Sequence, residues 1–268
     1  METKYDSRLP KSLINFMTGS RSFDLNRPSV TQLLHPPQAT ILQSMYPDYG
    51  EDIQDRVRMS LGTAFHNAVQ GNEERFEREH PSGLFTITGE PDDYEYVNAI
   101  GERERNVVLD YKTTSVYKIK RVMQEAQAFE IIDNLDESVL NKFSDALDWI
   151  LQLSMYAFLL AGDQMNYYSG RIICINFDAG NKRIMKSLKP PVPNNIQIID
   201  LPLVAYDELM KWTDRQWTRI NEAKKFYDDP SQEINVDLVK CKSSEVWGGN
   251  RCGEYCPFIE KCTGVLND

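Results

Sequence analysis

The stretch VVLDYKTTS, residues 107–115, joins an apolar, β-branched run to an acid and an amine. Side chains on a strand alternate between its two faces, so Asp110 and Lys112 share one face and Tyr111 lies on the other. The pattern predicts a strand that carries an acid and an amine into one site at its end. A surface salt pair on an edge strand would have the same short sequence, so the neighbouring segments must decide between the two.

The segments before this stretch also alternate with period two. LFTIT at 84–88 and YEYVNAIG at 94–101 predict strands, and we expect a strand meander over residues 83–114. Asp92 closes the segment GEPD between two of these strands and would lie beside Asp110 if the strands pair as a meander. Two neighbouring carboxylates repel each other, and a divalent cation relieves that repulsion. The alternative is an ordinary turn, since Gly, Pro and Asp are turn residues.

Two predicted helices carry further polar residues. Apolar residues recur at helical spacing over 51–79, and His66 lies in this segment, four residues after Gly62. Histidine suits Mn²⁺ or Zn²⁺ better than Mg²⁺, although a lone helical histidine can equally be structural. The segment 138–161 predicts one long helix ended by Gly162. Gln152 and Tyr156 are four residues apart and share one face of it; the alternative role for this pair is capping buried backbone groups in the core.

The remaining segments complete an α/β pattern. We expect a short helix capped by Ser29 or Thr31 and stopped at Pro36–Pro37, a buried strand at 171–177 with Cys174 in the core, a strand at 196–203 and an amphipathic helix at 204–228. The predicted fold is a single α/β domain, with a central mixed sheet flanked by helices. We divide the chain into an N-terminal extension and helix (1–50), the core with its flanking helices (51–235) and a cysteine module (236–268).

Composition excludes several classes of protein. The 268 residues are 41% hydrophobic and 26% charged, as in an ordinary globular protein, and 30 basic against 40 acidic residues give a net charge of −10. This balance argues against a protein that coats nucleic acid through its overall charge. Residues 111–124 and 179–199 nevertheless each hold four basic residues and no acid, which predicts either a local basic path or two solvated faces. No apolar run approaches the length of a membrane span, and the N-terminus has no signal-peptide core, so we expect a cytoplasmic protein.

Four of the five cysteines lie in the last 28 residues, with the spacing C-x10-C-x3-C-x5-C. These are Cys241, Cys252, Cys256 and Cys262. In a reducing compartment such a cluster predicts a metal site rather than disulfides. Four thiolates suit either a tetrahedral Zn²⁺ or an iron–sulfur cluster.

The order of these motifs resembles the PD-(D/E)XK nuclease superfamily, and more narrowly its RecB-like branch. G-x-x-x-H at 62–66 is followed by G-x-x-D at 89–92, D-x-K at 110–112 and Q-x-x-x-Y at 152–156. That branch includes the nuclease domains of RecB and AddB, CRISPR-associated exonucleases and many small phage exonucleases. The resemblance implies a restriction-endonuclease-like fold and metal-dependent cleavage of DNA.

The resemblance also implies a role for each matching residue. His66, Asp92 and Asp110, with the Tyr111 carbonyl, would bind one or two Mg²⁺ or Mn²⁺ ions. Lys112 would orient or polarise the attacking water and steady the phosphate.

Gln152 and Tyr156 would hold the DNA strand or support Lys112.

The segment CGEYCPFIEKC resembles the three C-terminal cysteines that hold a [4Fe–4S] cluster in the AddB and CRISPR-associated enzymes. Those enzymes take their fourth cysteine from upstream of the core, where this chain has none, so Cys241 would complete the set and Zn²⁺ stays an alternative.

From these implications we expect a DNA exonuclease that acts on single strands or on ends in recombination, replication or DNA degradation. A phage source and a recombination or replication protein as partner are compatible with that expectation. The alternatives are a non-catalytic DNA-end-binding or scaffold protein on a nuclease fold, and an iron–sulfur sensing protein.

Overall fold

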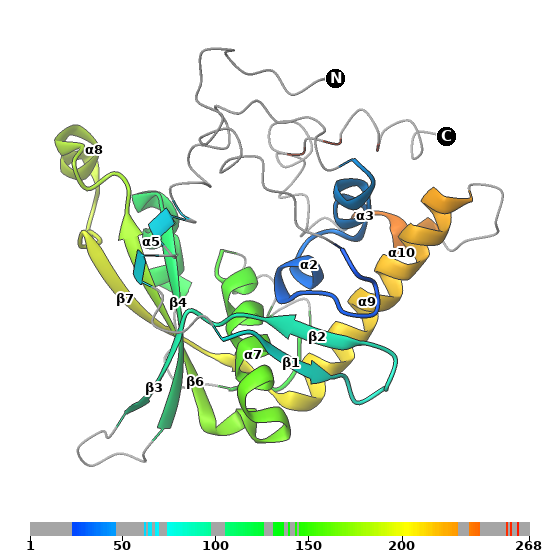
Figure 1. Ribbon diagram of the computed structural model, residues 1–268. Helices are drawn as coiled ribbons and strands as arrows, with labels where there is room; N and C mark the ends of the chain where they lie inside the picture. Colours follow the sequence, from blue (N-terminus) through cyan, green and yellow to red (C-terminus); the bar gives the residue numbers. More distant parts are fainter. Residues whose placement is uncertain are drawn as a thin grey trace. The chain divides into compact units, whose positions relative to one another are not determined.

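The structure is a computed structural model (Figure 1). It describes residues 23–46, 74–97, 105–125, 131–136, 145–229 and 236–241, and single positions at 62, 64, 65, 68, 69, 139, 143, 256, 258 and 262. The chain divides into two compact units. The sheet unit is Phe65–Lys211, and the terminal unit combines Met1–Ala64 with Trp212–Asp268.

The described elements are a mixture of helices and strands. In chain order they are α2 (Val30–Leu34), α3 (Pro37–Met45), β1 (Phe76–Glu79), β2 (Thr86–Gly89), β3 (Asp93–Val97), β4 (Arg105–Thr114), α5 (Val116–Glu125), β5 (Ile131–Ile132), α7 (Leu147–Ala161), η1 (Gly162–Tyr167), β6 (Tyr168–Asn176), α8 (Lys182–Ser187), β7 (Ile196–Leu201), β8 (Leu203–Val204), α9 (Tyr206–Asp228) and α10 (Val236–Val239). None of these helices is long and apolar enough to cross a membrane.

The main sheet has four strands in the order β3-β4-β6-β7. The pairs β3-β4 and β6-β7 are antiparallel, whereas β4 and β6 run parallel. The fold is therefore mixed α/β, as the sequence predicted. The central strand β4 buries its apolar residues on both faces, with Val108 and Leu109 at most 2% exposed, which is the usual environment of an interior strand with a parallel neighbour.

The predicted meander is only partly present. β3 pairs with β4 as expected, but β2 pairs with β1, in register from Phe76↔Gly89 to Glu79↔Thr86. The helix predicted over 51–79 is therefore wrong at its C-terminal end. The sequence FERE alternates half-buried and exposed side chains, which is the period of a strand, and Gly83 with φ of 70° makes the turn into β2. The described positions between 62 and 69 are helical.

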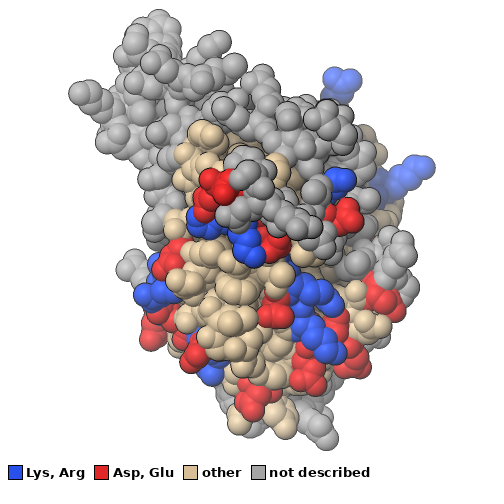
Figure 2. All heavy atoms as spheres, turned by 90° about the vertical axis from the view of Figure 1, so that its right-hand side faces the viewer, with Lys and Arg blue, Asp and Glu red and all other residues tan. Residues whose placement is uncertain are grey.

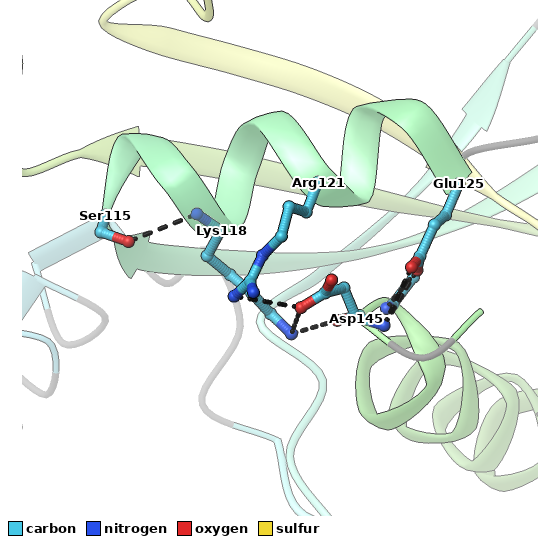
Figure 3. Close-up of polar contacts among 6 residues, drawn as sticks. Ser115, Lys118, Arg121, Glu125 and Asp145 are labelled. Atoms are coloured by element: carbon cyan, nitrogen blue, oxygen red, sulfur yellow. Dashed lines mark hydrogen bonds and ion pairs between the residues drawn. The ribbon is translucent and has the colours of Figure 1, made fainter. Parts of the chain in front are cut away.

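The helix α7 is buried almost throughout and packs against β4 and β6. Ten of its residues are buried, and a helix that is apolar on all sides belongs in a core. It starts later than the predicted residue 138, since the Glu125 carboxylate accepts hydrogen bonds from the backbone N–H groups of Asp145 and Ala146 at 3.0 and 2.9 Å (Figure 3). It ends as predicted at Gly162, whose φ of 63° suits a residue without a side chain.

The terminal unit contains the predicted short helix and most of the predicted amphipathic helix. Ser29 and Gln32 form a capping box at the start of α2. Pro37 does more than stop that helix, because it is also the first residue of α3. In α9 the Trp217 indole donates to the Leu25 carbonyl at 3.1 Å, and the Arg219 guanidinium donates to carbonyls at the end of α10.

Candidate functional site

Asp110 and Lys112 lie on the same face of β4, directed toward α7. The Asp110 carboxylate is 1% exposed, and its Oδ2 lies 2.8 Å from the Lys112 Nζ. A buried carboxylate is costly unless a cation or hydrogen-bond donors face it. The acid and amine that the sequence placed on one strand face therefore form an ion pair in which the carboxylate is buried and the ammonium group is partly exposed.

Asp92 comes directly before β3 and lies beside the same strand. Its Oδ2 accepts a hydrogen bond of 2.7 Å from the Tyr111 backbone N–H, and its side chain is buried, with the residue 6% exposed. Asp93 pairs with Leu109 in the β3-β4 register, so Asp92 stands next to Asp110 across the two strands. The register therefore puts two buried acidic residues, Asp92 and Asp110, opposite each other where β3 begins.

Gln152 on α7 connects the members of this group. Its Oε1 accepts from the Lys112 Nζ at 2.8 Å, and its Nε2 donates to Asp110 Oδ1 and to the Tyr156 hydroxyl, both at 3.0 Å. Ammonium groups only donate and ionised carboxylates only accept, so the two neighbours fix which way the amide points. Gln152 and Tyr156 lie on one helical face, as their spacing predicted, and that face covers Asp110 and Lys112.

Burial, with a smaller effect of nearby carboxylates, raises the pKa of two other side chains of the sheet unit. Burial, and then the carboxylates Asp93, Asp92 and Glu95, raise the pKa of the Tyr111 phenol. Burial, and then Asp110, raise the pKa of the Cys174 thiol to about 12. Cys174 is 0% exposed, as the core position predicted, and pairs with Lys112 in the β4-β6 register. No feature of the sequence predicted that Cys174 lies beside the candidate site.

His66 lies outside the described residues. Its neighbour in the chain, Phe65, contacts Tyr111 edge-on, with the ring centroids 6.2 Å apart. Phe65 therefore contacts the residue that directly follows Asp110 on β4.

The donors that are present fit a hard divalent cation. Asp92 and Asp110 supply carboxylate oxygens, the ligands that Mg²⁺ and Mn²⁺ prefer. This is a chemical environment in which a divalent cation is stabilised.

The structure describes three of the four tail cysteines, and all three raise the pKa of the same tyrosine. Burial raises the pKa of the Tyr227 hydroxyl, and the next causes are Cys262, Cys241 and Cys256. Cys262 Sγ also donates to the Gln38 side-chain oxygen. Within the described ranges, no three His, Cys, Asp or Glu side chains gather as a metal-binding group. Since Cys252 falls outside those ranges, the four-cysteine site stays a prediction.

The first basic segment is partly neutralised. The Lys118 Nζ and the Arg121 guanidinium both face Asp145, with Oδ1 at 3.5 and 3.2 Å (Figure 3). Figure 2 shows a different face, the right-hand side of Figure 1, where acidic and basic side chains are interspersed. The second basic segment contains α8 and is the other candidate for a basic surface.

Comparison with solved structures finds four matching chains. No protein-family model and no curated protein matches the chain. One of the solved structures, "Crystal structure of SSO0001", is 16% identical in sequence, over 96% of this chain and 94% of that chain, with a TM-score of 0.49. A likeness at this level establishes neither the fold nor the activity of the present protein.

Proposed function

We propose that the protein is a metal-dependent DNA exonuclease with a restriction-endonuclease-like core, of the RecB-like branch of the PD-(D/E)XK superfamily. The observation that carries the proposal is the group of Asp92, Asp110, Lys112 and Gln152, in which both acidic residues are buried. Its members come from a turn, a strand and a helix that are up to 60 residues apart in sequence, and contacts of 2.8–3.0 Å join the last three.

In the proposed reaction, water attacks a DNA phosphodiester and one P–O bond breaks. Asp92 and Asp110 would hold one or two Mg²⁺ or Mn²⁺ ions, with the Tyr111 carbonyl and His66 as further ligands. When bound, the cation supplies Lewis-acid stabilisation of the charge that develops on the phosphate.

The protein's own groups position the rest of the reaction. The Lys112 ammonium is a compact cation with three donors, so it can orient the attacking water and face a phosphate oxygen. Gln152 fixes the Lys112 ammonium and the Asp110 carboxylate relative to each other, and Tyr156 fixes the Gln152 amide. Such preorganised charge costs no rearrangement during the reaction, which makes it effective in catalysis.

We also propose that the tail cysteines Cys241, Cys252, Cys256 and Cys262 hold a [4Fe–4S] cluster, or Zn²⁺ in its place. The close spacing of these four thiols in the sequence supports a common centre in the terminal unit. Four thiolates at a metal stabilise the fold outright, so we assign this centre a structural role. An absorbance band near 400 nm, with iron and sulfide analysis, distinguishes the cluster from zinc.

The test of the function is degradation of end-labelled DNA by the full chain. Linear single strands, linear duplexes and a circular single strand are incubated with Mn²⁺, Mg²⁺ or EDTA. We expect product ladders from linear substrates with either metal, none with EDTA, and an intact circle. Cleavage of the circle would indicate an endonuclease. Binding of DNA ends without cleavage under any metal would favour the scaffold function instead.

A further inference from the structure

The parallel strands β4 and β6 end side by side at one edge of the main sheet. Just beyond them the Phe177 backbone N–H donates to the Thr114 carbonyl at 3.1 Å. Two aromatic side chains stand exposed at this edge, Tyr117 at 51% and Phe177 at 45%. In open α/β sheets, ligands bind outside the carboxyl ends of parallel strands. A ligand bound at this edge would therefore contact the two aromatic rings.

Exposed cations follow Phe177 closely in the chain. Lys182, Arg183 and Lys186 are exposed on α8, and spacings of three and four residues put Lys186 on the same helical side as the other two. The Lys189 carbonyl after α8 accepts a hydrogen bond of 2.6 Å from the Lys120 Nζ. This contact ties the segment that follows α8 to α5, the helix that carries Tyr117.

The acidic residues that flank this edge are already engaged. Asp178 Oδ2 accepts from the Val116 backbone N–H at 2.9 Å at the start of α5, and Asp145 faces Lys118 and Arg121. Each of these two carboxylates therefore has a donor or a cation of its own close by.

The edge also adjoins the proposed catalytic group. Lys112 is only two residues before Thr114, which is about 7 Å along a strand. On the helix side, the Lys118 Nζ lies 5.4 Å from the ring centroid of Trp149, and Trp149 is one turn before Gln152 on α7. A strand of nucleic acid with its scissile phosphate at Lys112 would thus reach the aromatic residues within one or two nucleotides.

We propose that one surface, here called the edge surface, binds the single-stranded DNA next to the scissile phosphate. It consists of Tyr117, Phe177, Lys182, Arg183 and Lys186. Bases stack on the two rings, and phosphates lie along the cations of α8. Stacking on aromatic rings tolerates any base, so the surface selects single strands rather than a sequence. The inference rests on the proposed nuclease function for the identity of its ligand, and it adds the surface residues that would hold the single strand.

The experiment measures the affinity of the full chain for fluorescein-labelled dT20 by anisotropy, without added divalent cation. We expect the double variant Tyr117→Ala/Phe177→Ala to raise the Kd at least about tenfold, since each stacked base contributes substantially to affinity. The triple variant Lys182→Gln/Arg183→Gln/Lys186→Gln should lower the slope of log K against log salt by about 2, because each phosphate contact to a single strand contributes about 0.7.

Matched controls are available elsewhere in the chain. Tyr167→Ala removes an aromatic ring that is 75% exposed, and Lys211→Gln/Lys224→Gln/Lys225→Gln removes the same charge from α9, where each lysine faces a carboxylate. Both controls should bind dT20 as the parent protein does. Equal losses in controls and edge variants, no binding of dT20, or tighter binding of a 20-base-pair duplex would each overturn the proposal.

The two proposals fail in different ways. If dT20 binds through the edge surface but no metal supports cleavage, the nuclease function is wrong and the surface stands as a single-strand-binding site. If the protein cleaves DNA while the edge variants keep the parent affinity, the nuclease function stands and the surface is wrong.

Discussion

Gln152 holds the geometry of the candidate site together. It uses its oxygen on Lys112 and its nitrogen on both Asp110 and Tyr156, so no other side chain of similar size reproduces its three contacts. The spacing of Gln152 and Tyr156 was visible in the sequence, but their contact with a strand about 40 residues away was not. The family resemblance predicted that this helix and this strand contribute to one site, whereas the periodicity of the sequence did not.

Replacement of Gln152 should separate positioning from folding. We expect Gln152→Leu to lower the DNA cleavage rate about 10²-fold, because small misplacement of reacting groups has effects of that size. Gln152→Glu should lower it similarly, since it keeps an acceptor for Lys112 but places a third carboxylate against Asp110. Tyr156→Phe, which leaves both of these contacts, should lower it less. A Gln152→Leu protein that cleaves at the parent rate would contradict the role of the amide.

Cys174 should make the fold less stable at high pH. An ordinary thiol ionises near pH 9, whereas burial raises the Cys174 pKa to about 12. The unfolded chain therefore releases this proton first. The contribution of Cys174 is fully present below pH 9 and falls between pH 9 and 12, by at most about 1.4 kcal/mol per pH unit.

Urea unfolding between pH 8 and 10.5 checks this prediction. The free energy of unfolding should fall more steeply with pH for the parent protein than for Cys174→Ala, whatever the two proteins' stabilities at pH 8. Parallel pH profiles would show that the thiol is not buried in the folded state.

The packing of α7 on β6 determines where Gln152 lies. At Gly170 of β6 an added Cβ would come within 2.8 Å of Leu203 Cδ2 and 2.9 Å of Leu153 Cδ1. Leu153 is the residue after Gln152, so a larger residue at position 170 pushes on the helix at the site itself. Glycine at this position allows the close approach of helix and strand.

Gly170→Ala should therefore affect stability and activity together. Overpacking of a filled core costs about 1–3 kcal/mol, which corresponds to a fall in Tm of several degrees for a protein of this size. Gly180→Ala is the matched control, because its added Cβ meets nothing within 4 Å among the described residues. Calorimetry of both variants measures the loss of stability, and their cleavage rates measure the loss of activity. If Gly170→Ala matches Gly180→Ala in both, the helix does not lie where the structure has it.

Segments with a long, uniform pattern were predictable, and short segments were not. The strand period of β4 and the helical period of α9 follow from their own residues, and α9 ends at Asp228 as expected. β1 has only four residues and is defined by its pairing with β2, which local spacing does not encode. The start of α7 depends on Glu125 from another helix, so its periodicity alone placed the start too early.

The net charge of the whole chain opposes the binding of the proposed DNA substrate. A protein with a charge of −10 repels DNA at long range, so affinity has to come from a local surface. The basic segment at 179–199 was visible in the sequence, but its nearness to α5 depends on the Lys120 contact with the Lys189 carbonyl. That contact joins segments 69 residues apart, which composition does not reveal.

The cysteine tail should stabilise the fold through a bound metal. We expect Cys256→Ala to lower the Tm and the content of bound iron or zinc together, since a structural metal contributes its binding energy to folding. Cys174→Ala is the control, because it removes a buried thiol of the main sheet and should leave the metal content unchanged. Full metal content and an unchanged Tm in Cys256→Ala would contradict a structural metal at the tail.

The most direct measurement compares the Mn²⁺-dependent cleavage rates of the parent protein, Asp110→Ala and Lys112→Ala on end-labelled single-stranded DNA. Thermal unfolding of each protein is recorded beside the rates. If the buried group on β4 and α7 is a metal-dependent hydrolytic site, both variants lose at least about 10³-fold in rate while they remain folded. A loss below tenfold in both folded variants would show that the chemistry, if there is any, lies elsewhere.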